Sequence, residues 1–480
     1  MDDPRRTPAG RRGRPRRVVT AGVRWIFAPL RRAKSWKKRS VTLPRRHIGW
    51  LAFYAALVLA LPGVGLFADP FAGTRGWASA FSVALAFEGF AILLIQFALV
   101  SRLAPISRTF GSDALTRLHR NMALAALVFV AVHPLLLAAG RDWRAWSPFH
   151  GSSGMRAGAL ALWMTVTVIV TSVARGRLRL SYEAWQAVHL VGACVLVGAA
   201  LAHMLRLGGA SQSPQMRWTL GAYAGLFLAL LLRYRLIRPL RAARRPWAVV
   251  ANEDIGGSTR LVRVHPVGHA GFAFAPGQFA WLITGSHPLW AGQHPLSIAS
   301  SDRRPDDGAI EFSIKALGDW SSTAVPALRP GQRVFVDGPF GAFTPELPPG
   351  EALVLVAGGV GIAPMRSMLL SLRDRRDRRR VVLFHAAASF SRVVFRDEID
   401  RLARELDLEV VYVLERPDTD WTGERGFITS DIVRRHLPPR FAEAEYFVCG
   451  PVPMMDAVEA ILIGLGVPSR RIHSERFQMV

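Results

Sequence analysis

Hydrophobic residues are distributed unevenly along the chain, and they divide it into two halves. The first 240 positions contain runs of about 20 predominantly apolar residues, which is the length a helix needs to cross a bilayer. The last 230 positions alternate apolar and polar residues over short stretches, as water-soluble domains do. The apolar runs predict six transmembrane helices, at residues 48–67, 79–100, 119–139, 156–174, 184–205 and 217–237.

The second half of the chain shows two different strand patterns. Over residues 246–345, short alternating runs such as TRLVRVHPV and QFAWLI are separated by Gly and Pro, which favours an antiparallel β-barrel. Over residues 350–480, strands such as ALVLVAGG and AEYFVCG alternate with helical stretches, which is typical of a doubly wound α/β domain. We therefore predict a basic tail (1–46), a six-helix transmembrane bundle (47–240), a barrel and an α/β domain.

The formal net charge of +26 arises mainly from Arg and Lys in the N-terminal tail, beside the apolar runs and on predicted surface helices. Because these charges accompany the membrane segments, they do not favour a nucleic-acid partner. Basic segments also follow the second, fourth and sixth predicted helices, so the positive-inside rule places both termini in the cytoplasm. We expect a lipid-embedded protein of a bacterial plasma membrane, although the Arg-rich tail also allows an organelle transit peptide. The oligomeric state stays open.

The chain contains two cysteines, Cys194 and Cys449, which lie in different halves. Two thiolates are too few for a plant-type iron–sulfur cluster within the chain, and the spacing supports neither a CxxC zinc site nor a covalently attached haem.

Four histidines in the predicted helices share one spacing. His119 and His133 lie 14 residues apart in the third helix, as do His189 and His203 in the fifth. Fourteen residues make about 3.9 turns and about 21 Å of rise, so each helix presents two imidazoles on nearly one face at two depths. Coordinating a metal relieves the cost of a neutral imidazole in hydrocarbon. The two helices run in the same direction, so we expect two stacked bis-histidine haem sites, an inner one (His119 and His189) and an outer one (His133 and His203).

The soluble half contains four motifs: HPLSIASS from His294, IKALGDWSS up to Ser322, VAGGVGIAPMRSML from Val356, and VCGPVPMM from Val448. As a set they resemble the motifs of the ferredoxin-reductase-like flavoproteins, and specifically the membrane branch that contains NADPH oxidases and ferric reductases. The resemblance extends over residues 47–480. It implies FAD, NADPH (or NADH) and two b-type haems as cofactors.

The resemblance also implies roles for individual residues. Ser297 would offer a hydroxyl to the flavin, and Cys449 would lie near the nicotinamide. Glu475 would be the family's C-terminal Glu, followed by Phe477 as the aromatic that covers the flavin, so these four are the predicted catalytic residues. The predicted FAD-binding residues are His294, Pro295, Leu296, Ser297, Trp320 and Ser321, with the backbone N–H groups near the last two forming an anion nest. The predicted nucleotide-binding residues are Gly358, Gly359, Gly361, Ile362, Pro364, Cys449, Gly450 and Pro451.

The sequence departs from the family pattern at two places. Ala363 stands where a Thr is usual, which removes one hydroxyl contact, and three residues follow Phe477 where animal NADPH oxidases end. Ser389 or Arg392 could contact a 2′-phosphate, which would favour NADPH over NADH, although a solvent-facing helix start would look the same.

These features predict electron transfer from cytoplasmic NAD(P)H through FAD and two haems to an external acceptor, either oxygen or a ferric chelate. Arg141, Arg144 and His150 in the outer loop could attract an anionic acceptor. Two alternatives stay open at this point. Electrons could pass to a quinone or a protein partner, or the histidines could form the relay of a proton or metal transporter with a regulatory flavoprotein.

Overall fold

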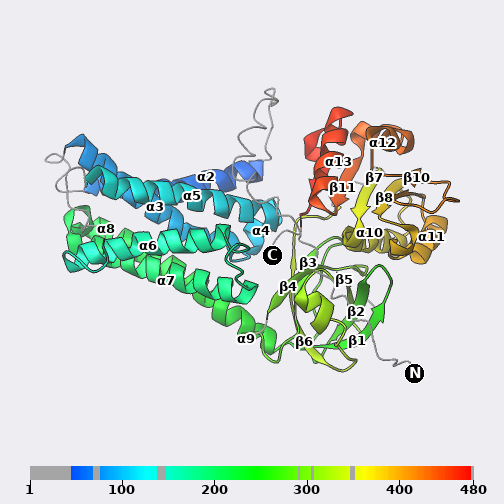
Figure 1. Cartoon of the computed structure of the whole chain (residues 1–480), viewed down its shortest axis with the longest axis horizontal. Helices are drawn as coiled ribbons and strands as arrows, with labels where there is room; N and C mark the ends of the chain where they lie inside the picture. Colours follow the sequence, from blue (N-terminus) through cyan, green and yellow to red (C-terminus); the bar gives the residue numbers. More distant parts are fainter. Residues whose placement is uncertain are drawn as a thin grey trace, which may run out of the picture. The chain divides into compact units, whose positions relative to one another are not determined.

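Long helices occupy the first half of the chain in the computed structural model (Figure 1). The structure describes residues 45–68, 76–137, 147–289, 292–303, 307–345 and 352–476. Within these residues, six helices are long and apolar enough to span a membrane, as predicted: His47–Ala68, Trp77–Val100, Ser112–Leu137, Ser153–Val173, Tyr182–Leu207 and Pro214–Ala243.

The elements of this half follow one another without strands. They are α2 (Arg45–Ala68), α3 (Trp77–Val100), α4 (Ala104–Phe110), α5 (Ser112–Leu137), α6 (Ser153–Val173), α7 (Tyr182–Leu207), η3 (Gly209–Gln212), α8 (Pro214–Leu232), the π-helical turn η4 (Arg233–Ile237) and α9 (Arg238–Ala243).

Helix ends follow local chemistry. The side chains of Ser152, Ser181 and Ser213 each accept a backbone N–H at the start of α6, α7 and α8, as N-cap residues do. The third spanning helix begins at Ser112 rather than at residue 119. Hydropathy marks only the apolar part of this helix, whereas the helix itself continues through polar turns in which Arg117 pairs with Asp113.

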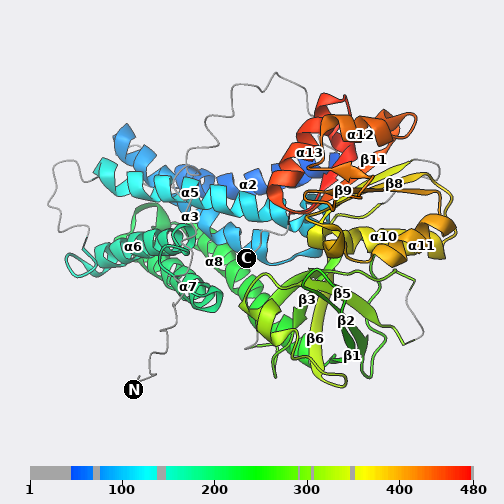
Figure 2. The ribbon, with the colours of Figure 1, turned by 45° about the vertical axis from the view of Figure 1, so that its right-hand side comes forward.

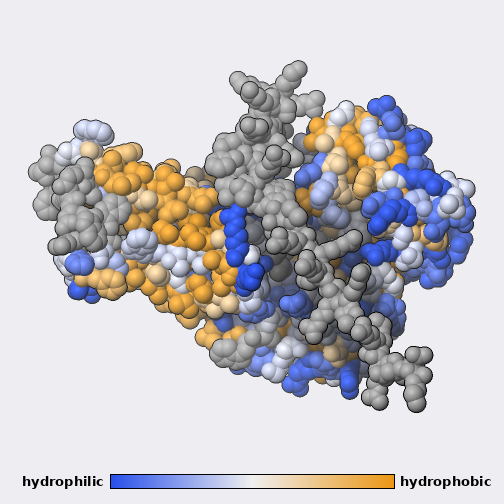
Figure 3. All heavy atoms as spheres, in the orientation of Figure 1, coloured by the Kyte–Doolittle hydropathy of each residue, from blue (hydrophilic) through white to orange (hydrophobic). Residues whose placement is uncertain are grey.

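The bundle is built from closely packed helix pairs. Helix α3 packs along α5, α6 packs along α7, and α8 lies against α3. Aromatic and aliphatic side chains from α2, α3, α7 and α8 form its buried core. Figure 3 shows apolar side chains over much of the outer surface of these helices, as expected where lipid is the solvent.

The first soluble unit is a six-stranded antiparallel barrel. The strand order is β4-β3-β6-β1-β2-β5, and a bridge between Ile298 and Phe312 joins the two edge strands, which closes the sheet. The elements are β1 (Trp247–Asp254), β2 (Thr259–Pro266), β3 (Phe279–Ile283), β4 (Gln293–Ser297), β5 (Ile310–Lys315), the π-helical turn η5 (Trp320–Ala324) and β6 (Arg333–Phe340).

The second soluble unit is a parallel sheet with helices on both faces, as predicted (Figure 2). Alternate residues of its central strand β7 enter two separate cores, one with α10 and α11 and the other with α12 and α13. The strand order is β10-β9-β8-β7-β11-β12. The elements are β7 (Leu353–Gly358), η6 (Gly359–Gly361), α10 (Ile362–Asp374), β8 (Val381–Ala387), η7 (Phe390–Arg392), α11 (Arg396–Glu405), β9 (Leu408–Leu414), β10 (Glu424–Arg425), α12 (Ser430–His436), η8 (Phe441–Glu443), β11 (Glu445–Cys449), α13 (Val452–Gly464), η9 (Ser469–Arg471) and β12 (Ile472–Ser474).

Candidate functional site

The four intramembrane histidines face one another in two pairs. The ring centroids of His119 and His189 are 6.2 Å apart, and those of His133 and His203 are 6.4 Å apart. Two imidazoles bound to opposite sides of one metal ion would have centroids about 6 Å apart, because each metal–nitrogen bond is about 2 Å long. No group of three or more His, Cys, Asp or Glu side chains capable of holding a metal occurs in the described residues. If a haem were bound between the rings, each pair would supply two ligands to its iron and the macrocycle would supply the others.

Hydrogen bonds set the tautomer of three of these histidines. A backbone carbonyl accepts from Nδ1 of His119 (Gln96, 3.3 Å), of His133 (Ser82, 3.0 Å) and of His203 (Gly154, 2.9 Å). A carbonyl oxygen can only accept, so the proton is on Nδ1 and the lone pair of Nε2 is available. This is the arrangement that metal-binding histidines adopt.

The fourth histidine reaches the same tautomer through a hydroxyl. His189 Nδ1 lies 3.1 Å from Ser172 Oγ, which also accepts from the indole N–H of Trp185 (3.1 Å). The Ser172 hydroxyl donates its own proton to the Val168 carbonyl (2.7 Å). Since that hydroxyl has no second proton to give, His189 donates from Nδ1 and keeps Nε2 free.

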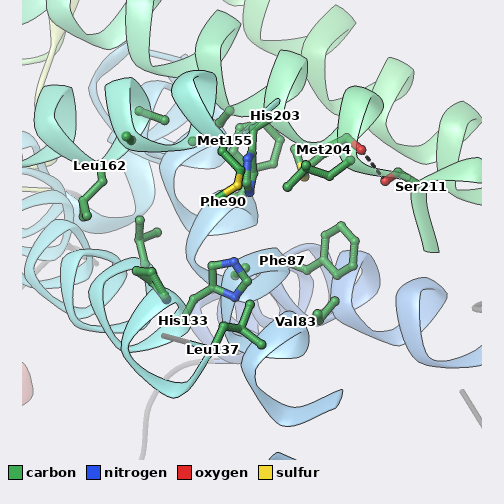
Figure 4. Close-up of a pocket in the computed structure, with 18 of the residues that line it drawn as sticks. Val83, Phe87, Phe90, His133, Leu137, Met155, Leu162, His203, Met204 and Ser211 are labelled. Atoms are coloured by element: carbon green, nitrogen blue, oxygen red, sulfur yellow. Dashed lines mark hydrogen bonds between the residues drawn. The ribbon is translucent and has the colours of Figure 1, made fainter. Parts of the chain in front are cut away.

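A largely apolar cavity of about 420 Å³ adjoins the outer pair. Figure 4 shows His133 and His203 pointing into it from α5 and α7. Its volume lies within the range of cofactor pockets, roughly 300–1,000 Å³. A Cβ atom at Gly158 would lie 2.4 Å from His203 Nδ1, so the lack of a side chain there makes room for the imidazole. The walls include Val83, Phe87, Phe90, Leu137, Met155, Leu162, Met204 and Ser211.

The predicted FAD-binding residues surround an aromatic stack in the barrel. The ring of His294 on β4 lies parallel to that of Trp320, with centroids 3.6 Å apart, and the indole N–H of Trp320 donates to Thr284 Oγ1 (2.9 Å). Burial lowers the pKa of His294 to about 4, so this ring is neutral at pH 7. Ser297 at the end of β4 is buried, with Pro295 and Leu296 on the same strand.

The side chain of Ser321, in the predicted phosphate nest, closes the turn that precedes it. The backbone N–H groups of Leu317 and Gly318 both donate to Ser321 Oγ, each at 3.0 Å. These two donors close the turn locally, so they would have to release the serine hydroxyl to bind a phosphate.

Glycines bring the two nucleotide motifs together at adjacent parallel strands β7 and β11. A Cβ at Gly361 would lie 2.2 Å from the Cys449 carbonyl oxygen, and one at Gly358 would lie 2.6 Å from Met454 Sδ. Gly359 has a φ of +56°, which glycine adopts without strain. The predicted residues Ile362 and Pro364 start α10, whose N-terminus faces this loop, as helices that bind pyrophosphate do. Pro451 precedes α13.

Two of the predicted catalytic residues, Cys449 and Glu475, are buried and interact with each other. Cys449 is fully buried, and burial followed by the nearby Glu475 carboxyl raises the pKa of its thiol. Burial, and to a smaller extent Asp113, raises the pKa of Glu475 to about 8, so this carboxyl is mainly protonated at pH 7. Its Oε2 has no hydrogen-bond partner among the described atoms. Phe477 lies outside the described residues.

Acidic residues at two helix starts connect the flavin residues with the inner histidine pair. Asp113 in the first turn of α5 interacts electrostatically with Glu475, and Glu183 in the first turn of α7 interacts with His294. The inner histidine follows six residues later on each helix, which is about 9 Å along the axis. The inner pair is therefore the one closer to the predicted flavin residues Glu475 and His294.

Sequence reasoning missed several polar residues of these sites. Nothing in the spacing of Ser82, Ser172 or Gly154 identified them as histidine partners.

Lys315 ends β5 with its Nζ 3.6 Å from the Cβ position of Gly359, where a cation could meet phosphate. Glu88 is the one acid deep inside the six described spans, where it interacts electrostatically with Tyr54 and Tyr223. Of the predicted outer-loop residues, Arg141 and Arg144 lie outside the described residues, and His150 contacts Ser147 Oγ (3.0 Å).

Comparisons with known proteins divide the chain in the same way. Residues 85–200 match the family described as "Ferric reductase like transmembrane component", and residues 355–460 match the "Oxidoreductase NAD-binding domain". The chain is 33% identical over 163 residues to NADH-cytochrome b5 reductase 1 of Debaryomyces hansenii, covering 33% of this chain and 57% of that protein. It is 34% identical over 254 residues to the flavohemoprotein of Deinococcus radiodurans, covering 51% and 60%. The chain thus spans less than two thirds of these relatives. Among solved structures, the ferredoxin reductase in carbazole 1,9a-dioxygenase is similar at 28% identity and a TM-score of 0.43, covering 48% of this chain and 69% of that one.

Proposed function

We propose that this integral membrane oxidoreductase, which joins a ferric-reductase-like transmembrane component to a ferredoxin-reductase-type NAD-binding module, passes electrons from cytoplasmic NAD(P)H through FAD and two b-type haems to an external acceptor. The two family matches confirm the resemblance that the motifs predicted. The proposed cofactors, direction of electron transfer and acceptor rest on the arrangement of the chain's own residues.

One observation carries the proposal: two imidazole pairs are stacked along α5 and α7, and every Nδ1 is held by a hydrogen bond. A proton relay needs imidazoles that exchange protons with one another. Here each Nδ1 proton is directed to a carbonyl or hydroxyl of a neighbouring helix instead. Fixed tautomers and a separation suited to one metal between the rings favour haem ligation by His119 with His189 and by His133 with His203.

Bound FAD would accept a hydride and release single electrons, and the haems would supply one-electron sites across the membrane. Three of the protein's own groups prepare this chemistry by staying uncharged at the proposed flavin site. Glu475 holds a proton at pH 7, the Cys449 thiol stays protonated, and the His294 ring is neutral. We expect Ser297 to direct its hydroxyl to the flavin and the glycine loop before α10 to bind the nucleotide pyrophosphate.

The polarity of the bundle supports outward transfer. The flavin residues approach the starts of α5 and α7, and those ends are cytoplasmic if the basic tail and loops are inside. An inside-negative potential then assists outward electron movement by about 2.3 kcal/mol per charge per 100 mV.

Two histidine ligands leave no open iron position, so the acceptor would be reduced by outer-sphere transfer. We therefore propose oxygen, giving superoxide, or a ferric chelate, giving ferrous iron. The nucleotide is NADPH or NADH, and Ser389 with Arg392 at η7 are the residues proposed to contact a 2′-phosphate.

The decisive test is the absorbance spectrum of detergent-purified protein before and after anaerobic addition of NADPH. A Soret band, a sharp reduced α-band and bleaching of the flavin are expected in the wild type, with about half of the haem lost in His203→Leu, because one of two pairs is broken. NADH in place of NADPH compares the nucleotides, and oxygen or ferric citrate added afterwards compares the acceptors. A spectrum of flavin alone would refute the haem assignment.

A further inference from the structure

Two arginines from separate parts of the bundle converge on one carboxylate of the barrel. Arg238 at the start of α9 donates from Nη2 to both oxygens of Asp337 on β6, at 2.8 and 2.7 Å. Arg102, between α3 and α4, donates from Nη1 to Asp337 Oδ2 at 3.4 Å. The bundle and the barrel are thus joined at one residue from two directions.

Arg102 also reaches the strand that carries the predicted flavin residues. Its Nη1 donates to Gln293 Oε1 at 3.0 Å, and Gln293 directly precedes His294. The guanidinium carbon lies 3.5 Å from the ring centroid of Trp281 on β3. Trp281 is paired with Pro295 on one side and with Asp337 on the other. One side chain of the bundle therefore contacts three adjacent strands of the barrel.

The side chains that join the bundle to the barrel are largely buried, and their charges are stabilised by one another and by aromatic rings. The side chains of Arg102, Arg238 and Asp337 are 13%, 15% and 25% exposed. One carboxylate faces two cations, and the aromatic faces of Trp281 and Tyr234 stabilise the second cation. Burial lowers the pKa of Arg102, and Tyr234 and Asp337 oppose this effect. The remaining space is about 10 Å³, at most one water, so this is a packed joint and not a ligand site.

The backbone at Arg102 is strained. Its φ is +54°, just after α3 ends with Ser101 as its C-cap. Glycine or asparagine is usual in this left-handed conformation, which is strained for other residues. An arginine there accepts this strain and directs a long cationic side chain to the barrel.

We propose that Arg102, together with Arg238 and Asp337, is a positioning clamp that sets the distance between the flavin strand β4 and the inner histidine pair. Helix α3 carries Gln96, whose carbonyl holds His119, six residues before Arg102. The clamp therefore connects the support of an inner histidine with the strand that precedes His294. It governs electron transfer from flavin to the inner site and leaves the hydride step alone. This inference rests on the proposed function.

The test uses Arg102→Gly in the purified full-length protein, because glycine removes the side chain and also relieves the strain at φ +54°. Amide hydrogen exchange should rise in β4 and in the turn between α3 and α4. In anaerobic stopped flow, flavin reduction by NADPH should stay within about twofold, whereas haem reduction should slow by roughly tenfold to a hundredfold, as expected for a misplaced partner. Asp337→Asn should do the same, since it leaves two buried cations unpaired.

Arg102→Lys and Arg263→Gln are the matched controls. Lysine keeps the charge but lacks the planar guanidinium, which donates several hydrogen bonds and stacks on Trp281. It should therefore restore haem reduction only in part. Arg263 forms an exposed ion pair with Asp307 on the same barrel, and its loss should change neither measurement. Unchanged exchange and haem reduction in Arg102→Gly, or an equal loss of flavin reduction, would overturn the clamp. A wild type whose haem is never reduced by NADPH would defeat the proposed function, and the exchange measurement would still test the joint.

Discussion

The inner and outer histidine pairs share one geometry but differ in their surroundings. Around the inner pair, the Trp185 ring lies 5.5 Å from that of His189, and the cation of Arg175 lies over Trp185. The outer pair borders an apolar cavity and no charged side chain lines it among the described residues. Polarity near the inner pair suits electron exchange with the predicted flavin residues, whereas an apolar outer site suits a cofactor held mainly by packing.

The support of each pair comes from the same two helices. Helix α3 supplies the partners of both α5 histidines through Gln96 and Ser82. Helix α6 supplies the partners of both α7 histidines, through Ser172 and Gly154. Helices α5 and α7 therefore set the positions of the imidazoles, and the neighbouring helices α3 and α6 set their tautomers.

The largest effect should separate the two pairs by their order in the electron path. His189→Leu breaks the inner pair and should abolish reduction of the remaining outer haem by NADPH. His203→Leu should leave the inner haem reducible and stop only delivery to the acceptor. Anaerobic spectra of both variants check this. If the outer haem of His189→Leu is reduced at the wild-type rate, the serial order is wrong.

The next effect should be confined to the outer pair. A valine at Gly158 would place its Cβ 2.4 Å from His203 Nδ1, so Gly158→Val should expel the imidazole and lower outer haem affinity by roughly a hundredfold. Haem titration of apoprotein measures this. Gly198→Ala on α7 is the control, because its Cβ would meet no atom within 4 Å. Loss of both haems in Gly158→Val would show general misfolding instead.

A smaller effect should reveal how each site is supported. Ser172→Ala removes the acceptor of both His189 and Trp185, so inner haem affinity should fall about tenfold. Ser82→Ala removes a hydroxyl but keeps the backbone carbonyl that accepts from His133, so the outer site should change much less. Haem titrations of the two variants compare these losses, and equal losses would contradict the assigned partners.

The smallest effect should be a pH dependence at the flavin side alone. Because the pKa of Glu475 is raised from 4.5 to about 8, this carboxyl is neutral at pH 7 and becomes charged by pH 9. The new negative charge near Asp113 and Cys449 should disfavour the arrival of electrons at the flavin. Reduction of the haems by NADPH should therefore slow a fewfold, while the potential of the outer haem stays constant. Glu475→Gln should remove this dependence. A profile unchanged in that variant would assign the titration to another group.

The raised pKa of Glu475 also makes the stability of the folded chain depend on pH. The folded chain holds a proton on Glu475 that the unfolded chain releases above about pH 4.5. Stability from this group is therefore fully present below that pH and is lost as the pH rises through about 8. Thermal unfolding of Glu475→Gln should lack this decline.

Much of the architecture was predictable from the sequence. Six apolar runs, a change to alternating strands after Pro246 and the motif order predicted the six spans, the barrel and the α/β domain. The two largest boundary differences are the start of α5 at Ser112 and the end of the sixth span at Ala243, and they arose because hydropathy does not register polar helical extensions. The equal intervals between histidines likewise predicted which imidazoles face each other.

The sequence by itself determined the periodic features: helix length, strand alternation and the 14-residue interval that places two imidazoles on one face of a helix. Only the tertiary structure decided the partners, since Gln96, Ser172, Gly158 and Arg102 act on residues far along the chain, or on another helix or strand. Periodicity is local and can be read from one segment. A hydrogen bond, a missing Cβ and a clamp depend on which segments pack together, and no local pattern records that.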